Sequence, residues 1–270
     1  MGSMATNKIG IGLCTFNRPK YFDQSSKAIV KQILPYVDRL VIYNDGSTLD
    51  YKKSYAWLER LHSPKIKIIH SPYNKGVGKA KNVLFKELMK DCEYIFIAED
   101  DIVPQDKRAI IHYMAANRMN GVEHMMFAHH GPENQQPDSL VDIDGPLEYY
   151  KASVGAWCFY TRNILKEVGL MDENFHNAWE HVEHTWRIFK HLKLPYGYYP
   201  DVIGSREFLK EIPGSIDNSS IGKPVTGERL DIIIEGLKYW KKKDKEFPAE
   251  HTLKHFEGVK NDLNTTTITK

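Results

Sequence analysis

Cysteine is scarce in this sequence. Its 270 residues include three, Cys14, Cys92 and Cys158, and none belongs to a CxxC pair. This scarcity argues against a disulfide framework and against a cysteine-rich zinc site. It fits a reducing compartment, and we expect a cytoplasmic protein.

A long apolar run and a signal-peptide pattern are also missing. We therefore predict no transmembrane segment, and peripheral contact with a membrane surface stays open. The first four residues, MGSM, resemble a cloning remnant. Residues 1–7 are accordingly predicted to be a disordered N-terminus outside the fold.

Neither sign of charge dominates the chain. The 37 Lys and Arg residues nearly balance the 35 Asp and Glu residues, which argues against a nucleic-acid partner. The basic run at 241–243 is typical of a solvated helix face.

Residues 9–101 do show a clear alternation of apolar, strand-like runs and helical spacings. This alternation predicts an α/β fold, with a doubly wound, mostly parallel central sheet flanked by helices. The length is sufficient for one large domain. The predicted strands are residues 9–16, 39–47, 65–71 and 94–101, and the predicted helices are residues 20–37, 48–62 and 76–91.

The pattern loosens after residue 105. The polar, turn-rich stretch 132–146 is predicted to be a surface loop or lid, and 148–162 a hairpin or strand pair. Residues 201–228, rich in Gly, Pro, Ser and Asn, are predicted to form a mobile loop. Residues 229–270 are predicted to be a C-terminal helical extension with a frayed tail. The other predicted elements are helices at 106–120, 180–193 and 229–243, and a strand at 124–131.

Polar residues follow each of the first four predicted strands, at 15–18, 44–47, 73–76 and 99–101. Ligands of parallel sheets bind beyond the carboxyl ends of the strands. We therefore expect these four ends to line one cleft.

The fourth end carries three adjacent acids, Glu99, Asp100 and Asp101, directly after an apolar strand. Mutual repulsion makes such a cluster costly unless a cation lies there. Mg²⁺ or Mn²⁺, which bind carboxylates together with substrate phosphates, would neutralise it. If the strand persists, Glu99 and Asp101 point to one side and Asp100 to the other. The alternative is a set of solvated acids at the N-terminus of a helix that begins near Pro104.

The other strand ends carry weaker signals. Asp45 is placed to accept hydrogen bonds from a base or a ribose, or it is a plain turn aspartate. The stretch NKGVGKAKN at 74–82 opens a helix whose amides, with Lys75 or Lys79, would meet a phosphate, or it is an ordinary helix start. TFNRP, at 15–19, places a hydroxyl, an amide and a guanidinium after the first strand.

In this order, the motifs resemble those of the inverting family-2-like glycosyltransferases of the GT-A fold. The chain reads TFNRP, YNDGSTLD, NKGVGKAKN and AEDD where that family carries TxNR, xDDGSxD, NxGxxxARN and DxD. RNILKEVGLMDENF, at 162–175, is similar to the family's segment before the catalytic helix. The resemblance covers residues 8 to about 192 and implies a GT-A catalytic domain over 8–200. Within it, 8–104 would be the nucleotide-binding half and 105–200 the acceptor half.

The resemblance also implies roles for individual residues. Asp101, with Glu99, would bind Mn²⁺ or Mg²⁺, and Asp100 would lie nearer the ribose. Asp45 would hydrogen-bond the nucleobase, usually uracil, so the implied donor is a UDP-sugar. The other residues implied for the nucleotide pocket are Thr15, Asn17, Arg18, Asn74, Gly76 and Lys79.

The chain departs from the family at the acceptor motif EDxDxxxR, whose second acid is the general base of inverting members. Residues 180–187 read EHVEHTWR, so His181 stands in that position. Glu180 would take the proton, or His181 would do so itself, since imidazole titrates near neutral pH. In a third reading no base is needed, as in the retaining peptide N-acetylgalactosaminyltransferases, which carry ENxExxxR. We favour inversion; the purely structural alternative is acids at a helix N-terminus.

A histidine late in the chain often completes the metal site in related enzymes, but residues 201–228 contain none. His251 and His255 fit a surface helix, and His129 and His130 either reach the acceptor or belong to a plain loop. The metal would then have only acidic and phosphate ligands, or a further ligand that the sequence does not identify.

We therefore expect a metal-dependent hexosyl- or N-acetylhexosaminyltransferase. It would move a sugar from a nucleoside diphosphate to a hydroxyl of a glycan or glycoconjugate, as in polysaccharide biosynthesis. A nucleotidyltransferase would need a Gly-rich basic loop after the first strand, which TFNRP lacks. The alternative from another class is a non-catalytic module that binds nucleotide sugars or glycans.

Overall fold

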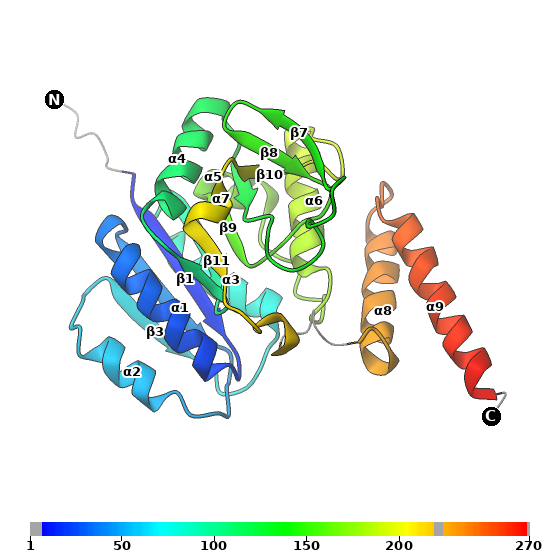
Figure 1. Cartoon of the computed structure of the whole chain (residues 1–270), viewed down its shortest axis with the longest axis horizontal. Coiled ribbons are helices and arrows are strands. Elements are labelled where there is room, and N and C mark those ends of the chain that lie inside the picture. The colour runs from blue at the N-terminus through cyan, green and yellow to red at the C-terminus, as the bar shows by residue number, and fades with distance from the viewer. Residues whose placement is uncertain (1–6, 219–223, 269–270) are drawn as a thin grey trace.

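A computed structural model describes residues 7–218 and 224–268 of the chain. A sheet lies at its centre (Figure 1). It has six strands, in the order β3-β2-β1-β4-β9-β6. Neighbours among β1 to β4 pair in parallel, whereas β9 runs antiparallel to both β4 and β6. The predicted doubly wound, mostly parallel sheet is therefore confirmed. The strands are β1 (Ile9–Thr15), β2 (Arg39–Asn44), β3 (Ile66–His70), β4 (Tyr94–Glu99), β6 (His124–Met126) and β9 (Trp157–Thr161).

Helices cover both faces of this sheet. They are α1 (Pro19–Gln32), η1 (Leu34–Tyr36), α2 (Lys52–Glu59), α3 (Val77–Leu88), α4 (Arg108–Asn120), α5 (Arg162–Val168) and α6 (Glu180–Leu192). Phe96 and Ala98 of β4 pack in the core that includes α1, α2 and α4. Ile95 and Ile97 pack in the opposite core, with α3, α5 and α6. Because side chains alternate between faces and both faces are buried, the strand reads as a continuous apolar run.

Two glycines in β1 allow α3 to pack closely against the sheet. A Cβ atom at Gly12 would lie 3.0 Å from Leu84 Cβ, and one at Gly10 would lie 2.7 Å from Leu88 Cδ2. A larger residue at either position would push the helix away. The close contact holds α3 antiparallel to β1, so that its N-terminus lies beyond the carboxyl ends of the strands.

The second half of the fold differs from the prediction in its small sheet. Residues 132–146, predicted to be a loop or lid, contain strand β7 (Leu140–Asp144). It joins β8 (Leu147–Tyr150) and β10 (Tyr199–Val202) in an antiparallel three-stranded sheet. The predicted strand pair at 148–162 is therefore split, because β8 belongs to this sheet and β9 to the central one. Local alternation identifies a strand but does not say which sheet will take it.

Residues 201–218 contain regular structure where we expect a mobile loop. They include α7 (Ser205–Phe208), β11 (Leu209–Glu211) and η2 (Ile216–Asn218). β11 pairs antiparallel with β5 (Ile102–Pro104), which follows the acidic triplet. Residues 219–223 lie outside the described residues, and the mobility of the segment stays a prediction.

The C-terminal extension is a helical hairpin at one side of the sheet domain, made of α8 (Gly227–Lys243) and α9 (Glu250–Ile268) (Figure 1). Its core joins Leu237 and Trp240 of α8 to Phe175 and Trp186 of the sheet domain. The predicted extension is thus confirmed, although α9 continues through residues that we expect to be frayed. No helix in the described parts of the chain is long and apolar enough to cross a membrane.

Candidate active site

The polar ends of β1, β2 and β4 lie together at one edge of the sheet. Thr15 pairs with Asn44 in the parallel register of β1 and β2, and Asp45 N donates to Thr15 O over 3.0 Å. Thr15 Oγ1 also donates to Asp100 Oδ2 over 2.5 Å. These contacts bring three of the predicted strand ends into one place.

Arg18 bridges the two aspartates beyond β4. Its Nη1 lies 2.9 Å from Asp100 Oδ1 and 2.9 Å from Asp101 Oδ2. Its Nη2 donates to the carbonyl oxygen of Ser215 over 2.9 Å. Since both carboxylates are buried, one guanidinium serves two acids that water cannot stabilise.

The two aspartates are in different electrostatic states. Burial raises the pKa of Asp100 to about 8, with added repulsion from Asp101, and Arg18 offsets this only in part. Burial would also raise the pKa of Asp101, but the close approach of His130 and the hydrogen bond and charge of Arg18 lower it to about 2. A further cation would therefore favour ionisation of Asp100.

Asp101 fits the predicted metal. Its Oδ1 is buried and has no hydrogen-bond partner, which is uncommon for a buried carboxylate oxygen. Such oxygens are the ligands that Mg²⁺ and Mn²⁺ prefer. Within the described residues, no three His, Cys, Asp or Glu side chains are arranged to hold a metal by themselves. Phosphate and water would complete the coordination.

Glu99 does not lie where the strand alternation predicts. β4 ends at Glu99, and Asp100 and Asp101 form a turn, so the alternation does not continue to Asp101. Glu99 Oε1 lies 2.5 Å from Lys81 Nζ instead. Because this carboxylate neutralises Lys81, the geometry gives Glu99 no support as a metal ligand.

Lys81 is a central residue that the sequence analysis missed. It is only 1% exposed, and besides Glu99 it contacts the carbonyl oxygen of Gly155, which accepts its hydrogen bond over 2.9 Å. A Cβ atom at Gly155 would lie 3.1 Å from Lys81 Nζ and 3.0 Å from His181 Cγ. Lys81 and Gly155 therefore connect the end of β4 to the start of α6. The family motif NxGxxxARN carries an arginine at this position, and this basic residue is the signal that could have identified Lys81.

Glu180 and His181 open α6 as a contacting pair. His181 Nδ1 lies 3.3 Å from Glu180 Oε1, and the His181 side chain keeps 25% exposure. Glu180 is buried, and its Oε2 has no hydrogen-bond partner. Burial alone would raise the pKa of Glu180, but the hydrogen bond and charge of His181 and the charge of Lys81 lower it. Glu180 is thus an ionised carboxylate held against an imidazole.

The C-terminal extension fixes the residue before this pair. Trp179 has φ of 69°, in the left-handed region that a bulky residue rarely adopts. Its indole Nε1 donates to the carbonyl oxygen of Ile233 in α8 over 3.0 Å. A Cβ atom at Gly236 would lie 2.9 Å from Trp179 Cδ1. Helix α8 therefore holds the backbone conformation from which α6 starts.

Two residues predicted for the nucleotide pocket hold loops in this structure. The carboxylate of Asp45 accepts hydrogen bonds from Lys75 N and Gly76 N over 2.9 to 3.0 Å. Burial raises the pKa of Asp45 in spite of these bonds. Asn17 Oδ1 accepts from Thr48 N over 2.8 Å, which joins the loops after β1 and β2.

Three residues predicted to contact the nucleotide or its phosphates share a cavity of about 360 Å³ at the start of α3. Residues of the loop before α6 line the same cavity, and the sequence analysis did not single them out. The predicted residues are Asn74, Gly76 and Lys79, with Lys75 as the alternative lysine, and the others are Tyr73, His176 and Asn177.

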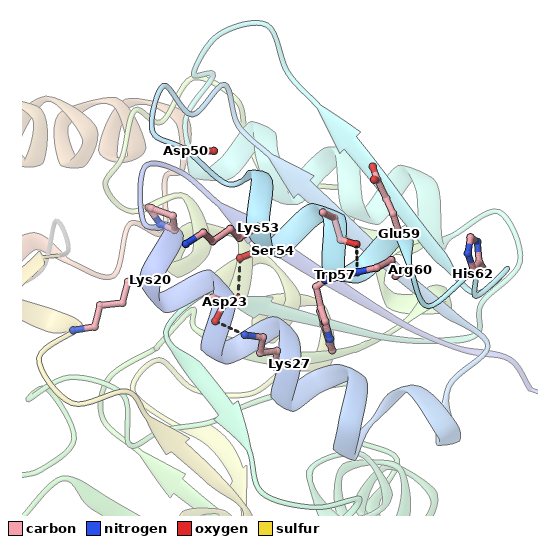
Figure 2. A pocket seen from close by; sticks show the side chains of 12 residues that line it. Lys20, Asp23, Lys27, Asp50, Lys53, Ser54, Trp57, Glu59, Arg60 and His62 are labelled. Carbon is pink, nitrogen blue, oxygen red and sulfur yellow. Dashed lines mark hydrogen bonds and ion pairs between the residues drawn. The ribbon is translucent and has the colours of Figure 1, made fainter.

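A larger cavity, of about 910 Å³, lies between α1 and α2 (Figure 2). None of the predicted site residues lines it. Asp23 accepts hydrogen bonds from Ser54 Oγ over 2.9 Å and from Lys27 Nζ over 2.7 Å. The polar groups drawn there partly satisfy one another, and the acids after β4 remain the better candidate site.

The family model for glycosyl transferase family 2 matches residues 11–140 of the chain. No curated protein matches the chain. Solved structures with a similar fold include residues 1–349 of TarS from S. aureus in complex with UDP-GlcNAc, at 14% identity and a TM-score of 0.60. That match covers 86% of this chain and 66% of the TarS chain.

Two further structures share the fold. GalNAc-T7 with UDP, GalNAc and Mn²⁺ is 11% identical, with a TM-score of 0.63, over 88% of this chain and 49% of its own. The second is the mannosyltransferase PcManGT from Pyrobaculum calidifontis, in complex with GDP-Man and Mn²⁺. It is 12% identical, with a TM-score of 0.59, and the match covers 94% of this chain and 70% of the PcManGT chain. The chain thus spans about half the length of the GalNAc-T7 chain. The chain shares the GT-A fold of these glycosyltransferases, and its residues 11–140 match the model of glycosyl transferase family 2.

Proposed function

We propose that the chain transfers a sugar from a UDP-sugar to a hydroxyl of a glycan or glycoconjugate, with a divalent metal and with inversion at the anomeric carbon. One observation carries the proposal. Lys81 and Gly155 connect Glu99, the last residue of β4 and the neighbour of Asp100 and Asp101, to the Glu180–His181 pair at the start of α6. A donor bound at the acids would then lie beside a candidate base.

The donor half of the proposal rests on charge. Asp101 offers a buried, unpaired oxygen to Mn²⁺ or Mg²⁺, and Asp100 and Thr15 offer hydrogen-bonding groups to the ribose. The metal, when bound, would offset the negative charge that develops on the departing diphosphate. The amides at the start of α3, with Lys79, would contact the phosphates or the nucleotide.

The acceptor half requires a base. In our proposal His181 removes the proton from the acceptor hydroxyl, whose oxygen bonds to the anomeric carbon as the bond from that carbon to the UDP oxygen breaks. The proton stays on His181, and the electron pair of the broken bond leaves with UDP. Glu180 holds the imidazole ring in place, and Glu180 itself stays ionised because its pKa is lowered.

Inversion follows from this choice of base. A single displacement needs an acceptor hydroxyl that is deprotonated as it attacks, and a histidine next to a carboxylate supplies a group for that step. The retaining alternative rests on a neutral amide at this position in related enzymes. This chain has a titratable side chain there, which supports the inverting reading.

The direct test is UDP release by the purified chain with Mn²⁺, a panel of UDP-sugars and GDP-sugars, and a panel of acceptors. NMR of the product's anomeric proton would report the configuration. We expect Asp101→Asn to lower turnover by about 100-fold or more, because one metal ligand is lost. Nucleotide-sugar binding with no turnover on any acceptor would instead favour the non-catalytic module.

A further inference from the structure

We infer that His130 is a protein ligand of the divalent metal, together with Asp101. The inference rests on the proposed function and names a residue of that site. No motif in the sequence marks His130 for this role, and it comes from the segment after β6 and not from the C-terminal part of the chain.

His130 is a buried side chain with unused hydrogen-bonding capacity. It is 2% exposed, and neither ring nitrogen has a hydrogen-bond partner. Its Nε2 lies 3.4 Å from Asp101 Oδ2, which accepts a hydrogen bond from Arg18 Nη1 over 2.9 Å. The other oxygen of this carboxylate, Oδ1, is buried and unpaired. Buried polar atoms in native proteins nearly always have a partner. Several unpaired atoms at one place therefore point to a ligand that binds between them.

The separation of these atoms suits a shared ion. Two ligand atoms at about 2.1 Å from one metal lie about 3.0 Å apart at a right angle, and farther apart at wider angles. The 3.4 Å between His130 Nε2 and Asp101 Oδ2 falls in that range. It is also too long for a good hydrogen bond between the two side chains.

The backbone around His130 is fixed against the acidic turn. Gly131 has φ of 74°, and its N–H donates to Glu211 Oε2 over 2.9 Å. Glu211 lies opposite Ile102 in the pairing of β11 with β5, directly after Asp101. Ile212 N also donates to Asp101 O, over 2.8 Å. Strand β11 therefore fixes the backbone next to His130 and the backbone at Asp101 relative to each other.

The neighbouring histidine has a different role. His129 Nε2 is hydrogen-bonded to Tyr150 Oη over 3.1 Å, and its ring packs against Phe127 and Tyr150. His129 thus packs against Tyr150 of the small sheet. As a histidine at the adjacent position, it is a matched control for substitutions of His130.

Two consequences follow for the metal. A site with two protein ligands needs the donor's phosphates and water to complete it, so metal binding should depend on the nucleotide. An imidazole ligand also favours transition metals over Mg²⁺, so Mn²⁺ should be preferred.

The test is Mn²⁺ binding to the full chain, measured by electron paramagnetic resonance with and without UDP, for the wild type, His130→Gln and His129→Gln. We expect UDP-dependent binding that His130→Gln weakens by about tenfold or more and that His129→Gln leaves unchanged. Electron spin echo measurements on the wild-type complex should show a directly bound ¹⁴N nucleus, which His130→Gln removes. This last readout does not depend on activity.

The outcomes separate the inference from the proposed function. If Mn²⁺ binds with UDP but the wild type shows no ¹⁴N coupling, the His130 assignment is wrong and the metal-dependent transferase stands. Equal losses in the two histidine variants would also overturn the assignment. If neither Mn²⁺ nor Mg²⁺ binds with any nucleoside diphosphate, the metal dependence and the His130 assignment both fall.

Discussion

Lys81 Nζ lies 2.5 Å from Glu99 Oε1, and this ion pair joins the middle of α3 to the last residue of β4. The pair explains one member of the acidic triplet without a metal. Burial lowers the pKa of Lys81, but the charge of Glu99 outweighs this effect and raises it above its ordinary value. Lys81 is thus a charged, buried lysine that depends on Glu99 for its charge balance.

Glu99→Gln should destabilise the fold and leave the metal site intact. Removing one partner of a buried ion pair leaves an uncompensated charge, and we expect a loss of about 2–3 kcal/mol in the free energy of unfolding. Mn²⁺ affinity in the presence of UDP should not change. Urea unfolding and Mn²⁺ titration are the two measurements, with Asp101→Asn as the variant that loses the metal. A double variant, Lys81→Met with Glu99→Gln, should recover part of the stability. Loss of Mn²⁺ binding in Glu99→Gln alone would restore Glu99 as a ligand.

His181→Ala should slow the chemical step. We expect kcat to fall by about 100-fold to 10,000-fold, because a positioned general base contributes that much. The affinity for the UDP-sugar should not change, since His181 is placed on the acceptor side. Single-turnover rates and calorimetric titration of the donor separate the two effects. His191→Gln, at the exposed end of the same helix, is the control. A normal rate in His181→Ala would exclude this residue as the base.

Trp179→Phe tests whether α8 positions the start of α6. The variant keeps an aromatic ring but loses the hydrogen bond from Trp179 Nε1 to Ile233 O. We expect about 1 kcal/mol less stability and a lower kcat with unchanged donor affinity. Trp57→Phe, in α2 beside the larger cavity, is a matched substitution at a place that should not affect turnover (Figure 2). Equal effects of the two variants on kcat would contradict the positioning role.

Gly155→Ala should disturb the connection between the acids and the base. The added methyl group would lie 3.0 Å from His181 Cγ and 3.1 Å from Lys81 Nζ, so one of these side chains must move. Such crowding costs about 1–3 kcal/mol in the free energy of unfolding, and activity should fall further than this stability loss explains. Gly258→Ala is the control, because open space surrounds that position in α9 and alanine favours the helix by about 1 kcal/mol. Full activity in Gly155→Ala would show that the contact is not needed.

Glu87 should make stability depend on pH under acidic conditions. Hydrogen bonds from Lys67 Nζ and Lys90 Nζ, over 2.6 and 2.5 Å, lower the pKa of Glu87 to about 2 from an ordinary 4.5. A lowered pKa means that the folded state favours the ionised form. The stabilisation is therefore complete above pH 4.5 and is lost as the pH falls toward 2.

We expect Glu87→Gln to lower the free energy of unfolding by roughly 1 kcal/mol at pH 6, a value reduced for partial solvent screening. The difference from the wild type should shrink as the pH falls from 4.5 to 2. Urea unfolding across this range checks it. A difference that grows on acidification would contradict the ion-pair assignment.

The first half of the fold is predictable from sequence because its signals are local. Strands β1, β2 and β4 are buried on both faces, so each reads as an apolar run, and turn residues follow them. The edge strand β3 is only partly buried, and its isoleucines still mark it as a strand. Asp100 and Asp101 could be located for the same reason, as acids where a buried strand ends. The division of residues 148–162 between two sheets depends on strand pairings that are distant in the sequence. Strand β11 likewise pairs with β5, which lies more than 90 residues earlier in the chain.

The parts of the site that sequence reasoning missed are long-range contacts. Lys81 meets Gly155 across 74 positions of the chain, and Arg18 meets Asp100 across 82. A lysine in a helix-start motif and an arginine after a strand carry no local sign of such partners. At Glu99 the predicted strand was two residues too long, since β4 ends there, and the alternation of side chains did not indicate the ion pair with Lys81.

The central claim is that a nucleoside diphosphate and its metal bind at Asp100 and Asp101. A crystal structure with a UDP-sugar and Mn²⁺, with anomalous scattering recorded at the manganese edge, tests it most directly. We predict an anomalous peak within bonding distance of an Asp101 carboxylate oxygen, with the diphosphate on its other side. A fully bound nucleotide whose manganese peak lies elsewhere, while Arg18 still bridges both aspartates, would contradict the account.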